Sequence, residues 1–170
     1  PSQTMNPDGT LKLFKGYPTA STTAAMFAFA IAEESPFIGS GALDGQGIPP
    51  DFFADVHVRK GFNYCFDWDT YIADGLQGEG IQARGPIIEG LQGWRADSPA
   101  YNFDLDKCKA ELEQAWEGKL PELGFKMSLV YNQGNETRKM AAQILAENLA
   151  LVDAKYVVTV QELEWPKFLE

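Results

Sequence analysis

The sequence has few of the residues that catalysis and nucleic-acid binding require. His57 is the only histidine among the 170 residues, so a Ser-His-Asp or Cys-His nucleophile, or a zinc site, would have to depend on it. It falls in the predicted first turn of a helix, where a surface or capping position is the simpler interpretation. The 14 Lys and Arg residues are scattered among 24 Asp and Glu residues, and the net charge is -10. A nucleic-acid binder needs clustered cations that displace counterions, so the composition argues against nucleic acid.

Long apolar runs and ion-binding motifs are also missing. No stretch of about 18 apolar residues occurs, so no membrane-spanning helix is predicted within this sequence. Residues 67–74 carry three aspartates, but Tyr71 and Ile72 stand where an EF-hand loop needs an oxygen donor and a glycine. The glycine-rich stretch 39–47 is followed by no Lys-Ser/Thr pair, so it lacks the phosphate-binding pattern. We therefore expect no metal site and no cofactor.

What is present predicts one α/β domain over residues 1–170. Apolar residues make up 45% of the chain, and a chain of this length buries about two thirds of its unfolded surface. Residues 125–132 and 155–163 have strand patterns, and between them a helical pattern begins after Asn135. Strand, helix and strand with short connections predict two parallel neighbours.

Other segments complete the predicted organisation. Asp55 and Asp104 are each followed by apolar residues at helical spacing, so each is a predicted helix cap. The continuous apolar run 24–31 suits a central strand. Glycine and proline make 33–50 and 78–94 predicted loops.

Two segments resemble a known family. Residues 58–72 read VRKGFNYCFDWDTYI, and residues 129–149 read LVYNQGNETRKMAAQILAENL before the final ELEWPKFLE. The first is similar to the VRxAxxxAxDxxxxI helix, and the second to the strand, helix, strand and E-W-x-x-F-L segment, of bacterial ABC-transporter extracellular solute-binding proteins of family 5, the dipeptide- and oligopeptide-binding class. Gly61 stands where that pattern has alanine, which suggests close packing.

The resemblance implies a receptor and not an enzyme. The implied fold is one lobe of a type II periplasmic-binding-protein (Venus-flytrap) fold, a mixed sheet flanked by helices. The chain is then expected to be a fragment of the C-terminal lobe, with the N-terminal lobe missing. The full-length protein would be periplasmic or extracellular and lipid-anchored, and would deliver a peptide or a related small solute to ABC permease subunits. Which solute it carries stays open among peptides, nickel chelates, opines and oligosaccharides.

The resemblance also bears on the two cysteines. An exported protein meets an oxidising compartment, where Cys65 and Cys108 could pair. Each, however, lies on the apolar stripe of its own helix, where the family pattern carries a small residue. We therefore predict two buried free thiols that act as small hydrophobes.

The implied ligand-binding residues follow a strand and precede a helix. In open α/β sheets, ligands bind beyond the carboxyl ends of the strands, and in the resembled family this loop and the first helical turn face the cleft. That nominates Asn132, Gln133, Asn135 and Thr137. Asn135 also begins an Asn-Glu-Thr glycosylation pattern, but a helix cap explains it more simply.

Two further residues complete the predicted site. The tryptophan of the E-W-x-x-F-L pattern lines the ligand pocket in oligopeptide-binding relatives, which nominates Trp165; from composition alone, a partly buried core or edge position is equally acceptable. The loop 78–94, with Arg84, is expected to border the same cleft.

Two alternatives belong to other functional classes. A peptide or glycan hydrolase could use Asp67 and Asp69 as acid and base, although helix capping explains them better. A sensory or scaffold module would bind without transport, and a missing permease partner would favour it.

Overall fold

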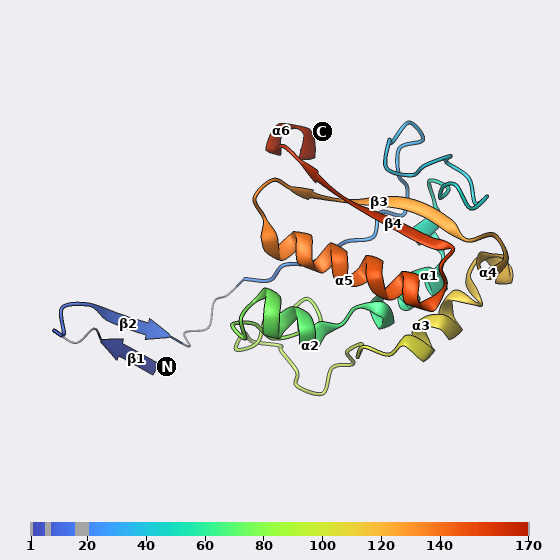
Figure 1. Ribbon diagram of the computed structural model, residues 1–170. Helices are drawn as coiled ribbons and strands as arrows, with labels where there is room; N and C mark the ends of the chain where they lie inside the picture. The colour runs from blue at the N-terminus through green and yellow to red at the C-terminus, as the bar shows by residue number, and fades with distance from the viewer. Residues whose placement is uncertain (1, 6–7, 16–20, 170) are drawn as a thin grey trace.

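The computed structural model describes residues 2–5, 8–15 and 21–169 (Figure 1). The α/β class is confirmed, and two two-stranded sheets occur within these residues. The elements are β1 (Ser2–Met5), β2 (Lys12–Lys15), η1 (Phe52–Ala54), α1 (Val56–Cys65), α2 (Trp68–Thr70), η2 (Tyr71–Gly75), α3 (Leu105–Leu112), η3 (Ala115–Gly118), α4 (Leu120–Leu123), β3 (Phe125–Asn132), α5 (Glu136–Val152), β4 (Tyr156–Leu163) and α6 (Trp165–Phe168).

The predicted strand–helix–strand unit is confirmed and positions the candidate site. β3 and β4 pair in parallel from Phe125↔Tyr156 to Asn132↔Leu163, and α5 connects them along one face of the pair (Figure 1). Asn135 caps α5, as expected, because its side chain accepts a hydrogen bond from the Arg138 backbone. Both strands therefore end at the edge where α5 begins.

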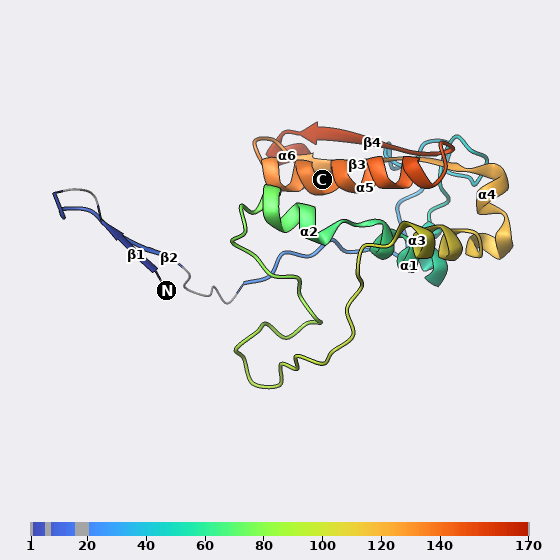
Figure 2. The same cartoon turned by 60° about the horizontal axis from the view of Figure 1, so that its bottom comes forward.

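A second layer of helices lies on the other side of α5 (Figure 2). α1 and α3 pack against each other and both contact α5. Asp55 caps α1 and Asp104 caps α3, as the sequence predicts. The Asn148 side chain of α5 donates to the Cys65 carbonyl oxygen over 2.9 Å, which ties the layers together.

The core is mainly aromatic where these layers meet. Phe125 of β3 stacks on Tyr156 of β4 with ring centroids 5.0 Å apart, and its other neighbours include Phe52 at 5.2 Å and Phe62 at 6.0 Å. All four side chains are buried. Large rings buried in contact contribute strongly to stability, so this cluster anchors the strand pair on the helical layer.

The two cysteines form a disulfide, so the prediction of two free thiols is wrong. Cys65 and Cys108 are bonded with their Cα atoms 5.3 Å apart, and both are fully buried. The helical stripes that carry them face each other, because α1 packs on α3. Gly61 allows that approach: a Cβ placed on it would lie 2.6 Å from the Leu112 Cδ2 atom. The close packing suggested by this glycine is confirmed.

The apolar run 24–31 is not a strand, which corrects a second prediction. Met26 and Phe29 are largely exposed, with 90% and 58% of their surface accessible. Phe27 packs against the core, and the Ile31 amide donates to the Pro50 carbonyl oxygen over 2.8 Å. The segment contains no helix or strand and does not belong to either sheet of the described residues.

The expected loops are present. Residues 33–50 form a loop beside β3, where the Ser128 amide donates to the Phe37 carbonyl oxygen over 2.9 Å. Residues 78–94 contain no helix or strand. The hairpin of β1 and β2 projects from the body (Figure 1). No helix in the described ranges is long and apolar enough to cross a membrane.

The chain turns in a left-handed sense after α3, which no sequence pattern predicts. Trp116, Glu117 and Gly118 have φ values of 53°, 58° and 78°. Non-glycine residues rarely adopt this conformation. The Asp55 carboxylate stabilises it, because its Oδ2 accepts from the Trp116 amide over 2.7 Å. α3 ends before this turn, at Leu112.

Candidate functional site

The loop between β3 and α5 is held rigidly at the carboxyl ends of the strands. The Gln133 amide donates to the Leu163 carbonyl oxygen over 2.7 Å. The Gly134 amide donates to Glu162 Oε1 over 3.1 Å, and its φ of +76° suits glycine. Both contacts bind the loop to β4, so its backbone has a fixed position at this edge.

Two of the nominated side chains hydrogen-bond within the first turn of α5. Asn135 Oδ1 accepts from the Arg138 amide over 3.0 Å and from Thr137 Oγ1 over 2.9 Å. The Asn135 oxygen is therefore engaged as a helix cap, and Thr137 supports it. The capping interpretation of Asn135 is confirmed, whereas a ligand contact by either residue remains a prediction.

Arg138 is a residue that the sequence analysis missed. Its Nη1 donates to Asn132 Oδ1 over 2.8 Å, and its guanidinium carbon lies 5.6 Å from the centre of the Phe168 ring. One side chain thus connects the end of β3 to α6. Its position in the first turn was a usable signal, because a cation is unfavourable near a helix N-terminus.

Trp165 lies on α6, directly after β4. Pro166 follows it inside the helix, as expected from the fixed φ of proline. The Trp165 ring stacks on Phe168 with centroids 5.8 Å apart and planes 21° apart, and 53% of its surface remains exposed. The ring is thus not enclosed in this structure, and α6, which carries it, lies beside the ends of β3 and β4 (Figure 1).

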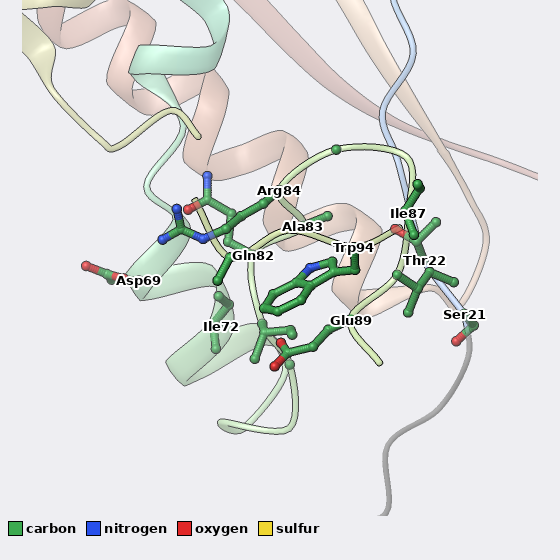
Figure 3. Close-up of a pocket in the computed structure, with 15 residues that line it drawn as sticks. Ser21, Thr22, Asp69, Ile72, Gln82, Ala83, Arg84, Ile87, Glu89 and Trp94 are labelled. Carbon is green, nitrogen blue, oxygen red and sulfur yellow. The ribbon is translucent and has the colours of Figure 1, made fainter. Parts of the chain in front are cut away.

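Arg84 lies in a different place. It lines an open hollow of about 550 Å³ with Trp94, Asp69 and Ile72, which belong to the loop 78–94 and to α2 and η2 (Figure 3). Arg84 Nη1 donates to the Ser98 carbonyl oxygen over 3.3 Å. None of the strand-end residues Asn132, Gln133, Asn135, Thr137 and Trp165 lines this hollow. The structure thus brings five of the six predicted residues to one edge and separates the sixth.

The charged residues of the edge pair with one another. Lys139 Nζ lies 3.3 Å from Glu136 Oε2, and the hydrogen bond with this carboxylate raises the pKa of Lys139 above its usual value. Glu162, which accepts from Gly134, adds to the same effect on the pKa of Lys139. Lys139 therefore remains charged at neutral pH.

The residues considered for catalysis and metal binding have structural contacts. Asp67 Oδ1 accepts from the Thr70 amide over 3.0 Å and caps α2. His57 Nδ1 lies 2.7 Å from Glu111 Oε2, which joins α1 to α3. No group of three or more His, Cys, Asp or Glu side chains suited to a metal occurs in the described part of the chain.

The sequence profile of the bacterial extracellular solute-binding proteins, family 5 (Middle), matches residues 3–170. The chain belongs to this family. The family 5 chain is 28% identical over 120 residues to the dipeptide-binding protein of Escherichia coli K12, which is 68% of this chain and 21% of that protein. It is 37% identical over 57 residues to the probable D,D-dipeptide-binding periplasmic protein DdpA of the same organism, 34% of this chain and 11% of that protein. The match thus spans at most 21% of the length of these two relatives.

Solved structures share the fold. The periplasmic binding protein DppA from Helicobacter pylori, in complex with the peptide STSA, matches with a TM-score of 0.58 and 21% identity over 82% of this chain and 23% of its own. AgaA from A. tumefaciens R10, in complex with agropinic acid, also has a TM-score of 0.58, with 20% identity over 78% of this chain and 24% of its own. The type II periplasmic-binding-protein fold expected for this family 5 chain is confirmed.

Proposed function

We propose that this chain is part of the solute-binding component of an ABC importer, which captures a peptide or a related small solute and delivers it to a membrane permease. Membership of family 5 over residues 3–170 is the observation that carries the proposal. Relatives named as dipeptide-binding and a structure in complex with the peptide STSA favour a peptide-like ligand. The structure in complex with agropinic acid keeps an opine among the candidates.

The proposed ligand wall is the edge formed by Asn132, Gln133, Asn135, Thr137 and Trp165. It lies at the carboxyl ends of two parallel strands, where α/β sheets bind ligands. The exposed Trp165 ring supplies apolar contact area, while loop amides and side chains supply polar groups. We assign Arg84 to the hollow of the 78–94 loop, as a second, separate candidate contact.

A single wall buries too little of a ligand for tight binding, because ligand sites usually enclose most of the ligand surface. We therefore propose that residues 1–170 form one domain, a fragment of the C-terminal lobe, and that an N-terminal lobe closes over the ligand by a hinge motion. The matched share of the relatives, 21% and 11%, supports a larger receptor. Binding, closure and release then make up its whole mechanism, without catalysis.

The proposed location is the periplasm or the cell exterior, with a lipid anchor on the full-length protein. The buried Cys65–Cys108 disulfide supports export, because disulfides persist in oxidising compartments and are rare in the cytosol.

Mass spectrometry of the solute that co-purifies with the natively isolated receptor tests the proposed function. A peptide or peptide-like solute, released only on denaturation, is the expected result. Receptor that carries no solute and binds none from a mixture of di- to pentapeptides, opines and oligosaccharides would contradict transport and favour a scaffold role.

A further inference from the structure

A short helix carries the exposed tryptophan of the proposed ligand wall. α6 has four residues, Trp165–Phe168, and isolated helices much shorter than about 12 residues are unstable in water. Its position therefore depends on contacts with the rest of the protein. The aromatic stack within it joins Trp165 to Phe168, so whatever fixes Phe168 also fixes Trp165.

Arg138 makes that contact. Its guanidinium carbon lies 5.6 Å from the Phe168 ring centre, within the range of a cation–π interaction. The same guanidinium donates to Asn132 Oδ1 over 2.8 Å, which orients it from the end of β3. A planar guanidinium can stack on a ring and donate a hydrogen bond at the same time, whereas an ammonium presents only a compact charge.

Comparison with Lys139, the neighbouring cation, shows that positive charge alone does not account for the contacts of Arg138. Lys139 lies in the same helical turn and pairs with Glu136 of its own helix over 3.3 Å. Arg138 is exposed, and its side chain instead reaches Asn132 and Phe168 outside the helix. A cation in this turn is disfavoured by the helix dipole, so the contacts beyond the helix are what distinguish Arg138.

We propose that Arg138 is the positioning residue of the ligand wall: through Phe168 it holds the Trp165 ring at a set place at the carboxyl end of β3. This role rests on the proposed function of the edge, because it concerns how the wall is shaped. Arg138 acts on the ligand through Trp165, by fixing the ring before the ligand arrives and so lowering the ordering cost of binding.

Fluorine NMR of the full 170-residue chain labelled with 5-fluorotryptophan tests the role. The four tryptophans give four signals, and Trp165→Phe identifies the one from Trp165. Arg138→Gln should move the Trp165 signal by more than its linewidth and leave the other three in place. Lys139→Gln, which removes one cation from the same turn, should move none of them.

Phe168→Leu should move the Trp165 signal as well, and adding Arg138→Gln to it should produce no further shift, because the intermediary ring is gone. If Arg138→Gln prevents folding, Asn132→Ala decides, since it removes only the group that orients the guanidinium, and it should also move the Trp165 signal. A Trp165 signal that stays in place in folded Arg138→Gln, or in Asn132→Ala, overturns the proposal. The measurement needs no ligand, so a receptor without a solute would refute the proposed function while leaving this result intact.

Discussion

Trp165 has 53% of its surface exposed to solvent, although its ring stacks on Phe168. Tryptophan rings combine a large apolar surface with a polar N–H group, which suits a surface that a ligand covers. Its exposure argues against an enclosed core position, whereas an edge position and a ligand contact are both compatible with it. The contact with a ligand remains the untested step.

Trp165→Ala should weaken solute binding about five- to thirtyfold, from the loss of about 1 to 2 kcal/mol of stacking and apolar contact. Its effect on folding should stay well below the roughly 3 to 5 kcal/mol that truncation of a buried aromatic costs. Calorimetric titration with the co-purified solute and the urea midpoint of the same variant give both numbers. Trp94→Ala is the matched control, since Trp94 lines the separate hollow. Loss of affinity in Trp94→Ala alone would place the ligand in the hollow.

Gly61→Ala should destabilise the protein, although alanine has a higher helix propensity than glycine. Alanine is favoured over glycine in a helix by about 1 kcal/mol, but the new Cβ would lie 2.6 Å from Leu112 Cδ2 and 2.7 Å from its Cγ. Leu112 is fully buried, and overpacking of a core costs roughly 1 to 3 kcal/mol. Urea unfolding should show a net loss of up to about 2 kcal/mol. In a Leu112→Ala background the same substitution should stabilise the protein; a stabilised single variant would contradict the close packing.

At the scale of the elements, Asp55 accepts hydrogen bonds from two of them, α1 and η3. Its Oδ1 accepts from the His57 amide over 2.7 Å and caps α1, while its Oδ2 accepts from the Trp116 amide in the left-handed turn. Asp55→Ala should therefore lower the free energy of unfolding by roughly 2 to 4 kcal/mol, because it removes the cap of α1 and leaves the Trp116 amide unpaired. Asp104→Ala removes a carboxylate that contacts its own helix, at the Lys107 amide and, over 3.1 Å, at the Lys107 ammonium, and should cost about 0.5 to 2 kcal/mol. Equal losses in denaturant unfolding would show that the bond to Trp116 contributes nothing.

The disulfide joins α1 to α3 and closes a loop with a sequence separation of 43 residues. Restricting the unfolded chain in this way stabilises the fold by roughly 4 kcal/mol in the loop-entropy model. Cys65→Ala with Cys108→Ala should lower the free energy of unfolding by about that amount under non-reducing conditions. In a strong reductant, the difference between the natural chain and the double variant should largely vanish. A protein that labels fully with a thiol reagent after denaturation without reductant would show that no disulfide had formed.

The elements differ in how far sequence alone could predict them. The caps at Asp55, Asp104 and Asn135 and the paired strands β3 and β4 follow from local patterns, which the structure obeys. The disulfide depends on which face of α1 meets α3, and that is decided by tertiary packing. The run 24–31 was mistaken for a strand because continuous apolar residues indicate burial, whereas strand pairing requires a neighbour with free backbone groups. Arg138 was missed because its side-chain partners, Asn132 and Phe168, belong to two other elements, β3 and α6.

At the scale of the whole molecule, the buried phenol of Tyr156 makes the free energy of unfolding fall at alkaline pH. Burial raises its pKa from 10.0 to about 12, and the charges of Asp153 and Glu113 add to this. The folded state thus binds the phenol proton more tightly than the unfolded state. The contribution is fully present below pH 10 and is lost as the pH rises from about 10 through about 12.

The free energy of unfolding should therefore fall by up to about 2 to 3 kcal/mol across this interval, in addition to the contributions of other groups. Urea unfolding at a series of pH values, with Tyr156→Phe as the control, measures the part due to this phenol. The difference between the two proteins should be constant below pH 10 and should change above it. A difference that stays constant to pH 12 would refute the assignment to Tyr156.

The disulfide between Cys65 and Cys108 also determines what happens to the protein when its backbone is cut between these two residues. The exposed loop 78–94, with Arg84, lies between the two cysteines along the chain, so a protease that cuts once within it converts a closed ring into an open one without releasing a fragment. The cut protein gains one water in mass and runs as a single species on a gel without reductant, and it separates into two pieces only when the disulfide is reduced. The rim of the hollow can thus be severed while the two halves of the chain stay attached to each other.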